Sequence, residues 1–173
     1  MCGCHYDARQ ACRRGHKLQF SPVKQYALEH NLPLLQPEKL KDEAFVEALR
    51  AWKADLQIVV AFRMLPEVVW NMPRLGTFNL HASLLPQYRG AAPINWAVIN
   101  GDTETGITTF FLKHEIDTGE VIQQVRVPIA DTDNVGIVHD KLMLLGGRLV
   151  VETVDAILAG TVKSIPQEEM AVV

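Results

Sequence analysis

One short segment constrains the fold more than any other part of the chain. Residues 56–62 read LQIVVAF, an almost unbroken apolar run that is rich in β-branched side chains. A strand with one solvated face alternates apolar and polar residues, whereas a continuous apolar run is typical of a parallel strand covered on both faces. The segment therefore predicts a central strand in a sheet that has helices on both sides.

The rest of the chain alternates between helical and extended patterns. Helical spacing with capping residues predicts helices, and short apolar runs between turn residues predict strands. The expected helices are 22–30, 41–54, 66–70, 93–101 and 134–160, and the further expected strands are 32–36, 76–82, 106–112 and 121–129. In a chain of 173 residues, this alternation predicts one α/β domain with a mainly parallel sheet, whose ligands bind beyond the carboxyl ends of the strands.

Composition and charge exclude several classes of protein. Apolar residues make up 48% of the chain and charged residues 21%, which is typical of folded proteins. Seventeen Lys and Arg against 20 Asp and Glu give a net charge of −3, so any contact with nucleic acid must depend on local charge. The sequence shows neither a run of roughly 18 apolar residues nor the apolar core of a secretion signal. We therefore expect a cytoplasmic protein that has no membrane partner.

The cysteines are confined to the first twelve residues. Cys2, Cys4 and Cys12 are odd in number and crowded, so they cannot form a disulfide framework. Together with His5 they number four potential zinc ligands, but the spacing Cys-x-Cys-His differs from the usual Cys-x2-Cys pair. We therefore expect a loose terminus and no metal.

Two polar residues in one predicted strand form the best candidate for chemistry. Asn79 and His81 are two positions apart, so both side chains point to the same face of the sheet. An amide donor beside an imidazole suits a developing oxyanion. Asp117, in the turn between the next two strands, could hold His81 charged and relay protons. Each of these residue types, taken alone, is more often an ordinary polar side chain than a catalytic one. The assignment of a catalytic site therefore rests on their combination.

The longer motifs around these residues resemble a known family. FNLHASLLPQYRGAAPINWAVINGDTETG, followed by HEIDTG, is similar to the methionyl-tRNA formyltransferase family, and the resemblance runs from Arg14 to the end of the chain. It implies a Rossmann-like formyltransferase sheet and transfer of a formyl group from 10-formyltetrahydrofolate to the amine of initiator methionyl-tRNA. It also implies that Asn79, His81 and Asp117 are the catalytic residues. Neither a metal nor an obligate protein partner is implied.

The same resemblance implies two binding regions. The expected folate-binding residues are Phe62, Leu65, Pro66, Ser83, Leu84, Leu85 and Pro86. Family members often have Ala-Tyr-Gly-Leu-Ile-Leu-Pro where this chain has AFRMLP, which is one residue shorter and lacks the glycine. The expected tRNA-binding residues are Arg14, His16, Lys17 and Lys24, which would contact mainly phosphates.

Compared with the family pattern, residues 14–173 are expected to be a partial catalytic domain. Residues 1–13 depart from the family's Asp-Lys-Pro-Ala-Gly-Arg-Gly, and we interpret them as a non-native or disordered leader produced by a frameshift. The expected fold lacks its first strands and a C-terminal barrel domain. Without those strands, 32–36 would be detached from the sheet and 56–62 would be a bare apolar edge. We therefore expect little or no activity from this chain alone.

Three alternative functions are weighed at this point. A sugar-nucleotide amine formyltransferase has the same Asn, His and Asp, but it often reads Arg-Gly-Arg-Ala-Pro and Asp-Ala-Gly where this chain has RGAAP and DTG. Glycinamide ribonucleotide formyltransferase fits the YRGAAP run less well. From a different class, the chain could be a catalytically dead folate-binding fragment.

Overall fold

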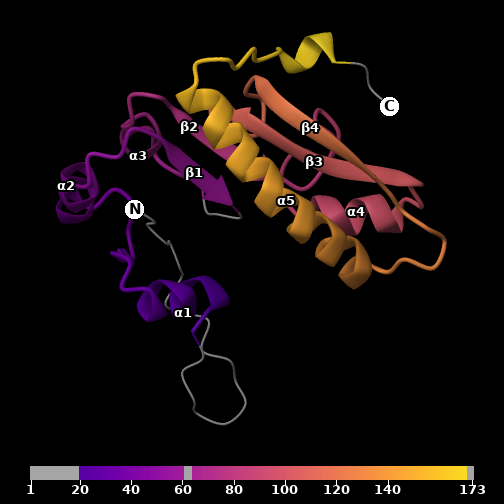
Figure 1. Ribbon diagram of the computed structural model, residues 1–173, viewed down its shortest axis with the longest axis horizontal. Helices are drawn as coiled ribbons and strands as arrows, with labels where there is room; N and C mark the ends of the chain where they lie inside the picture. The colour runs from indigo at the N-terminus through magenta and orange to yellow at the C-terminus, as the bar shows by residue number, and fades with distance from the viewer. Residues whose placement is uncertain (1–19, 61–63, 171–173) are drawn as a thin grey trace. The chain divides into compact units, whose positions relative to one another are not determined.

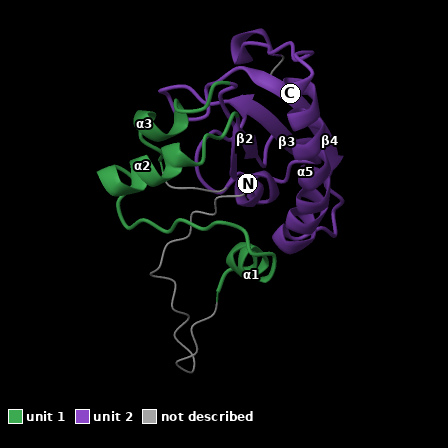
Figure 2. Ribbon diagram, turned by 60° about the vertical axis from the view of Figure 1, so that its left-hand side comes forward, with its two compact units in different colours: residues 1–55, 62–74 green, residues 56–61, 75–173 purple. Residues whose placement is uncertain are grey.

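The computed structural model describes residues 20–60 and 64–170 of the chain. The predicted leader, with its three cysteines, lies outside these residues. The chain divides into two compact units, which are described separately (Figure 2). Unit 1 comprises residues 1–55 and 62–74, and unit 2 comprises residues 56–61 and 75–173.

The described part of unit 1 contains the three predicted helices of this region. They are α1 (Pro22–Glu29), α2 (Glu43–Ala51) and α3 (Glu67–Trp70). α1 begins as the sequence predicts, because the Ser21 side chain accepts a hydrogen bond from the Lys24 amide and proline occupies the first helical position.

A small apolar cluster forms the core of unit 1. Phe45 and Val46 of α2 are buried against Val69 of α3, with Leu35 packed beside them. The predicted strand at 32–36 is wrong, because these described residues have no strand pairing. The segment instead contributes the Leu35 side chain to the apolar cluster.

Unit 2 contains a sheet of four strands in the order β1-β2-β3-β4. The strands are β1 (Gln57–Val60), β2 (Thr77–His81), β3 (Glu104–Phe111) and β4 (Val121–Pro128). Every strand predicted between residues 56 and 129 is therefore present. The expectation of a mainly parallel sheet is corrected, because β1–β2 is parallel but β2–β3 and β3–β4 are antiparallel. A parallel crossover needs a dozen or more residues, and the connection between β3 and β4 has only nine.

One face of this sheet is covered by two helices. α5 (Val135–Leu158) lies along β3 and β4, and α4 (Pro93–Ile99) packs beside it (Figure 1). The core between these layers is formed by Ile107 and Val127 of the strands together with Val138, Leu142 and Leu149 of α5.

A glycine in α5 permits close packing on the sheet. A Cβ added at Gly146 would lie 2.9 Å from Cδ2 of Leu80 on β2. Glycine lowers helix propensity by about 1 kcal/mol, so the packing it permits compensates for this cost.

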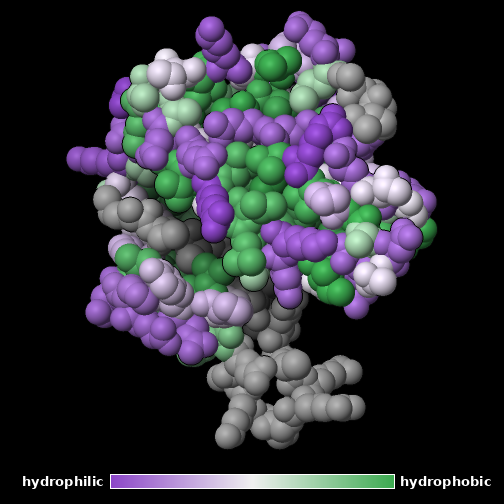
Figure 3. Space-filling view, turned by 45° about the vertical axis from the view of Figure 1, so that its right-hand side comes forward, coloured by the Kyte–Doolittle hydropathy of each residue, from purple (hydrophilic) through white to green (hydrophobic). Residues whose placement is uncertain are grey.

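β1 is an edge strand among the described residues. Residues 57–60 of the expected edge segment therefore lie at the edge of the described sheet, where Val60 is 57% exposed and Val59, whose side chain points to the opposite face, is 8% exposed. Large hydrophobic side chains are also exposed on α5, among them Leu144 and Val151. Figure 3 shows hydrophobic side chains between hydrophilic ones on one face of the molecule. No helix in the described residues combines the length and hydropathy needed to cross a membrane.

Candidate active site

The alternation of side chains along β2 separates a packing face from a polar face. Leu80 packs into the core beneath α5, whereas Asn79 and His81 point to the other face. The register with β3 places Phe110 opposite Asn79 and Thr108 opposite His81. We call the sheet face defined by these four residues the site face.

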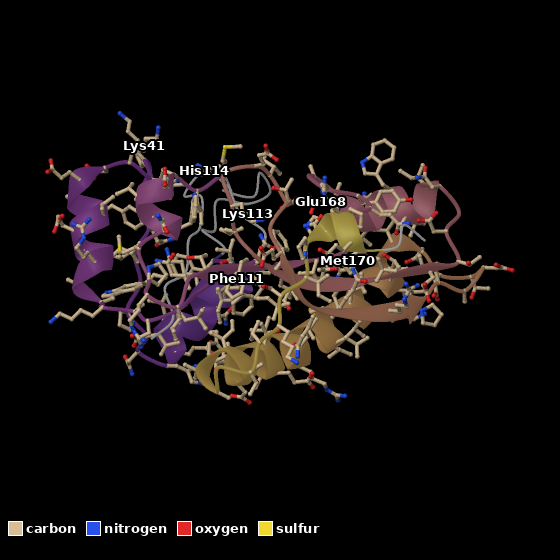
Figure 4. The ribbon with its side chains drawn as sticks, turned by 90° about the horizontal axis from the view of Figure 1, so that it is seen from above. Lys41, Phe111, Lys113, His114, Glu168 and Met170 are labelled. Carbon is tan, nitrogen blue, oxygen red and sulfur yellow. The ribbon has the colours of Figure 1, made fainter. Side chains whose placement is uncertain are left out.

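Asp117 reaches the site face from the loop 112–120 between β3 and β4. Figure 4 labels Lys113 and His114 of this loop. The Asp117 backbone has a φ of +53°, in the left-handed region, and its Oδ2 lies 3.8 Å from Nδ1 of His81. Each side chain is only 9% exposed, so little solvent screens the interaction when His81 is protonated. The structure thus brings Asp117 to His81 on the same face as Asn79.

The second ring nitrogen of His81 also has a protein partner. Nε2 lies 2.8 Å from the carbonyl oxygen of Tyr88. Since a carbonyl oxygen only accepts, Nε2 must donate this hydrogen bond. The other ring nitrogen, Nδ1, is the atom that faces Asp117.

The Asp117 carboxylate is held from the same loop that contacts His81. The Gly90 amide donates to Asp117 Oδ2 at 2.7 Å. Because Tyr88 and Gly90 both belong to the loop 83–90, this one loop orients both members of the His81–Asp117 pair.

The Tyr88 side chain fixes the end of this loop. Its hydroxyl donates to Asp102 Oδ2 at 2.6 Å and accepts from Asn100 Nδ2 at 2.9 Å. The hydrogen bond to Asp102 raises the pKa of the Tyr88 hydroxyl above its usual value, partly offset by Asn100. The hydroxyl therefore stays protonated as a donor at neutral pH, while the Tyr88 backbone presents its carbonyl to His81.

The start of the loop is fastened to the sheet by Thr108, which is fully buried. Thr108 Oγ1 donates to the Ser83 carbonyl oxygen at 2.7 Å and accepts from the Leu85 amide at 3.2 Å. It also accepts from Gln124 Nε2 at 2.9 Å. Ser83, Leu84 and Leu85 are themselves buried, so packing already accounts for their side chains.

Replacing Thr108 with valine should lower the free energy of unfolding by about 3 kcal/mol, because it leaves buried backbone groups of the loop without a partner. Urea unfolding of the 173-residue chain measures this. Thr161→Val is the matched control, since the exposed Thr161 hydroxyl makes only a 3.3 Å bond to Ala156; we expect a change below about 0.5 kcal/mol. Equal effects in the two variants would contradict the role of Thr108.

The other predicted binding residues belong to unit 1 or lie outside the described residues. Leu65 and Pro66 belong to unit 1, where Leu65 packs against the apolar cluster and the Pro66 carbonyl accepts from the first turn of α3. Phe62 lies outside the described residues, as do Arg14, His16 and Lys17. Of the predicted tRNA-binding residues, the structure describes Lys24, whose ammonium lies 4.2 Å from the Phe20 ring centroid.

Sequence reasoning missed three residues that hold the site together. Tyr88 and Gly90 stood in the quoted motif, but nothing in it indicated that their backbone groups bind His81 and Asp117. Gln167, which is 1% exposed and bonded to the Asp117 and Gly119 carbonyls, gave no signal because fifty residues separate it from Asp117. The described residues also contain no group of three or more His, Cys, Asp or Glu that could hold a metal ion.

The sequence and the fold match a known class of proteins. The formyl transferase family model matches residues 6–154, and the chain belongs to this family. A methionyl-tRNA formyltransferase from Bacteroides fragilis (strain ATCC 25285) is 91% identical over 159 residues, which are 92% of this chain and 49% of that protein. The chain thus spans about half the length of the curated relatives it matches.

Solved structures show the same Rossmann-like fold. A phosphoribosylglycinamide formyltransferase from Streptococcus pneumoniae has a TM-score of 0.72 and 26% identity, over 79% of this chain and 80% of that one. The formyltransferase PseJ from Anoxybacillus kamchatkensis, in complex with UDP-4,6-dideoxy-4-formamido-L-AltNAc and tetrahydrofolate, has a TM-score of 0.66 and 23% identity, over 87% of this chain and 78% of that one.

Proposed function

We propose that this chain supplies the catalytic residues for formyl transfer from 10-formyltetrahydrofolate to the amine of initiator methionyl-tRNA in the cytoplasm. The observation that supports this most directly is the buried His81–Asp117 pair beside Asn79 on the site face. The family match supports formyl transfer, and the relatives that are named methionyl-tRNA formyltransferases support the acceptor.

The proposed reaction needs a donor to the formyl oxygen and a path for one proton. The methionyl amine, whose pKa is about 8, is partly neutral at working pH and attacks the formyl carbon. The π electrons of the formyl carbonyl move onto its oxygen, and Asn79 and protonated His81 stabilise the resulting oxyanion. As the oxyanion collapses, the bond from carbon to N10 of the folate breaks. The amine loses a proton and N10 gains one, with His81 and Asp117 as the relay.

Folate and tRNA sites are parts of the same proposal. For the folate we propose Ser83, Leu84, Leu85 and Pro86 of the loop 83–90, whose Ser83 carbonyl oxygen is bonded to Thr108 of the site face. The PseJ complex with tetrahydrofolate supports a folate donor for this fold. For the tRNA we propose Arg14, His16, Lys17 and Lys24 as phosphate contacts, which supply local positive charge on a chain of net charge −3.

The experiment uses two proteins. One is the 173-residue chain, and the other is the Bacteroides fragilis relative with its matched 159 residues replaced by those of this chain, which we call the grafted protein. At 100 times its dissociation constant, 5-formyltetrahydrofolate should raise the melting temperature of the 173-residue chain by roughly 5 to 10 °C. The grafted protein should formylate initiator methionyl-tRNA at least about tenfold faster than a UDP-linked amino sugar.

Three results would contradict the proposal in different ways. Faster formylation of the amino sugar would identify the alternative acceptor. A melting shift without formyl transfer by the grafted protein would identify a folate-binding protein with a dead site. If the melting temperature does not shift and no formyl group is transferred, the proposed folate donor is contradicted as well.

A further inference from the structure

Gln167 is a buried amide whose hydrogen-bonding groups are fully used. It is the first residue of the short helix η1 (Gln167–Glu169). Figure 4 labels Glu168 in this helix and Met170 just after it. Its Nε2 donates to the carbonyl oxygens of Asp117 and Gly119, both at 2.8 Å. Its Oε1 accepts from Arg89 Nε at 3.0 Å and from Arg89 Nη2 at 2.7 Å.

The two donated bonds hold the turn that presents Asp117. Asp117 has a φ of +53°, a conformation that costs a residue with a side chain free energy unless its surroundings impose it. The hydrogen bonds from Gln167 to the Asp117 and Gly119 carbonyls hold this turn on either side of Thr118. The direction of the Asp117 carboxylate therefore depends on Gln167, although Gln167 does not touch that carboxylate.

The accepted bonds reach the other loop of the site. Arg89 lies between Tyr88, whose carbonyl accepts from His81, and Gly90, whose amide donates to Asp117. One side chain thus links the loop 112–120 to the loop 83–90, and these two loops hold both members of the His81–Asp117 pair.

The segment that delivers Gln167 is itself anchored to the sheet. Ile165 pairs with Val121 of β4 through two backbone hydrogen bonds of 2.8 and 2.9 Å. Met170, just after η1, packs on the cluster formed by Leu85, Phe110 and Val121. Anchors on both sides of Gln167 fix its position beneath the two loops.

We propose that Gln167 is a positioning residue for the proposed formyl transfer, acting through the Asp117 turn and Arg89 on the His81–Asp117 pair. The proposal rests on the function given above. The geometry requires an amide, because only an amide offers two donors to the carbonyls and an acceptor to Arg89 in one planar group. A glutamate keeps the acceptor but turns an oxygen toward the carbonyls, and a methionine of similar length keeps neither function.

The first test measures geometry in the 173-residue chain and does not need activity. The Gly90 amide reports directly on the Asp117 carboxylate, and the Val125 amide in the β3–β4 pair reports on the sheet. Hydrogen exchange of both amides is followed by NMR. The ratio of Gly90 to Val125 protection should fall about tenfold in Gln167→Met and Gln167→Glu. An unchanged ratio in both variants would overturn the proposal.

Thr153→Val is the matched control for loss of a buried polar side chain. Thr153 is fully buried, and its hydroxyl binds Gln123, Thr109 and the Leu149 carbonyl on the α5 face of the sheet. We expect this variant to lose stability while the Gly90 to Val125 ratio stays at the wild-type value. An equal fall of the ratio in Thr153→Val would mean that Gly90 reports general loosening, and would overturn the specific role of Gln167.

The second test measures the functional consequence in the grafted protein. Gln167→Met should lower kcat about 10- to 100-fold and change the KM for the formyl donor less than threefold, the effect expected of a displaced catalytic group. Added to Asp117→Asn, it should cause almost no further loss, because both changes act on the same group. If the fold-losses in kcat of the two single variants multiply in the double variant, Gln167 has only a general structural role. If the unmodified grafted protein transfers no formyl group, the proposed function fails, while the exchange ratios still decide whether Gln167 holds the turn.

Discussion

Replacing His81 with alanine should lower kcat for formyl transfer by about 10³-fold in the grafted protein, with little change in the KM for the formyl donor. His81 is 8% exposed and is oriented by Tyr88 through Nε2, with Nδ1 facing Asp117 at 3.8 Å. Alanine removes the charge that stabilises the oxyanion and the relay that moves the proton, so two contributions are lost together. Steady-state assays with charged initiator tRNA measure the effect.

The chain offers a matched control for this substitution. His139 on α5 also pairs with a carboxylate, its Nδ1 lying 3.1 Å from Asp140 Oδ1, but both side chains are more than half exposed. His139→Ala removes the same chemical pair away from the site face and should leave kcat unchanged within twofold. If His81→Ala also kept kcat within threefold of the unmodified protein, the assignment of the site would be wrong.

Local patterns predicted the strands of unit 2 well. The apolar run around Val59 and the alternation at Asn79 and His81 correspond to β1 and β2. These signals succeed because strand pattern and side-chain direction depend on neighbouring residues. The prediction at 32–36 failed because a strand also needs a partner, which its own five residues cannot specify. The prediction of a mainly parallel sheet failed for a similar reason, because the direction of a strand also depends on its partner. The sheet has one parallel and two antiparallel pairs.

Within the candidate site, the sequence indicated which side chains come together but not the groups that orient them. The Asn, His and Asp types suggested oxyanion stabilisation, and the structure brings Asp117 to His81. The groups that orient them are backbone atoms of Tyr88 and Gly90 and the distant amide of Gln167. Backbone carbonyls and amides are the same in every residue, so a sequence pattern does not reveal which of them will bind a catalytic side chain. That choice depends on the paths of two loops across the sheet.

Gly119→Ala should disrupt the Asp117 turn and destabilise the 173-residue chain by at least about 3 kcal/mol. A Cβ at this position would lie 1.5 Å from the Phe111 carbonyl oxygen and 2.7 Å from its carbonyl carbon. These are backbone atoms at the end of β3, beside the irregularity between Thr109 and Phe110, so no side-chain rotation can relieve the overlap. Either the turn or the strand must move, and both support the site.

Gly147→Ala is the matched control for Gly119→Ala. Gly147 lies in α5 with nothing within 4 Å of an added Cβ, so alanine should be neutral or stabilise the chain by up to about 1 kcal/mol through helix propensity. Urea unfolding of both variants gives the comparison, and the Gly90 amide resonance shows whether Asp117 has moved in any folded Gly119→Ala protein. A Gly119→Ala variant within about 1 kcal/mol of wild type, with that resonance unshifted, would show that the close approach of the turn to β3 is not needed to hold Asp117 beside His81.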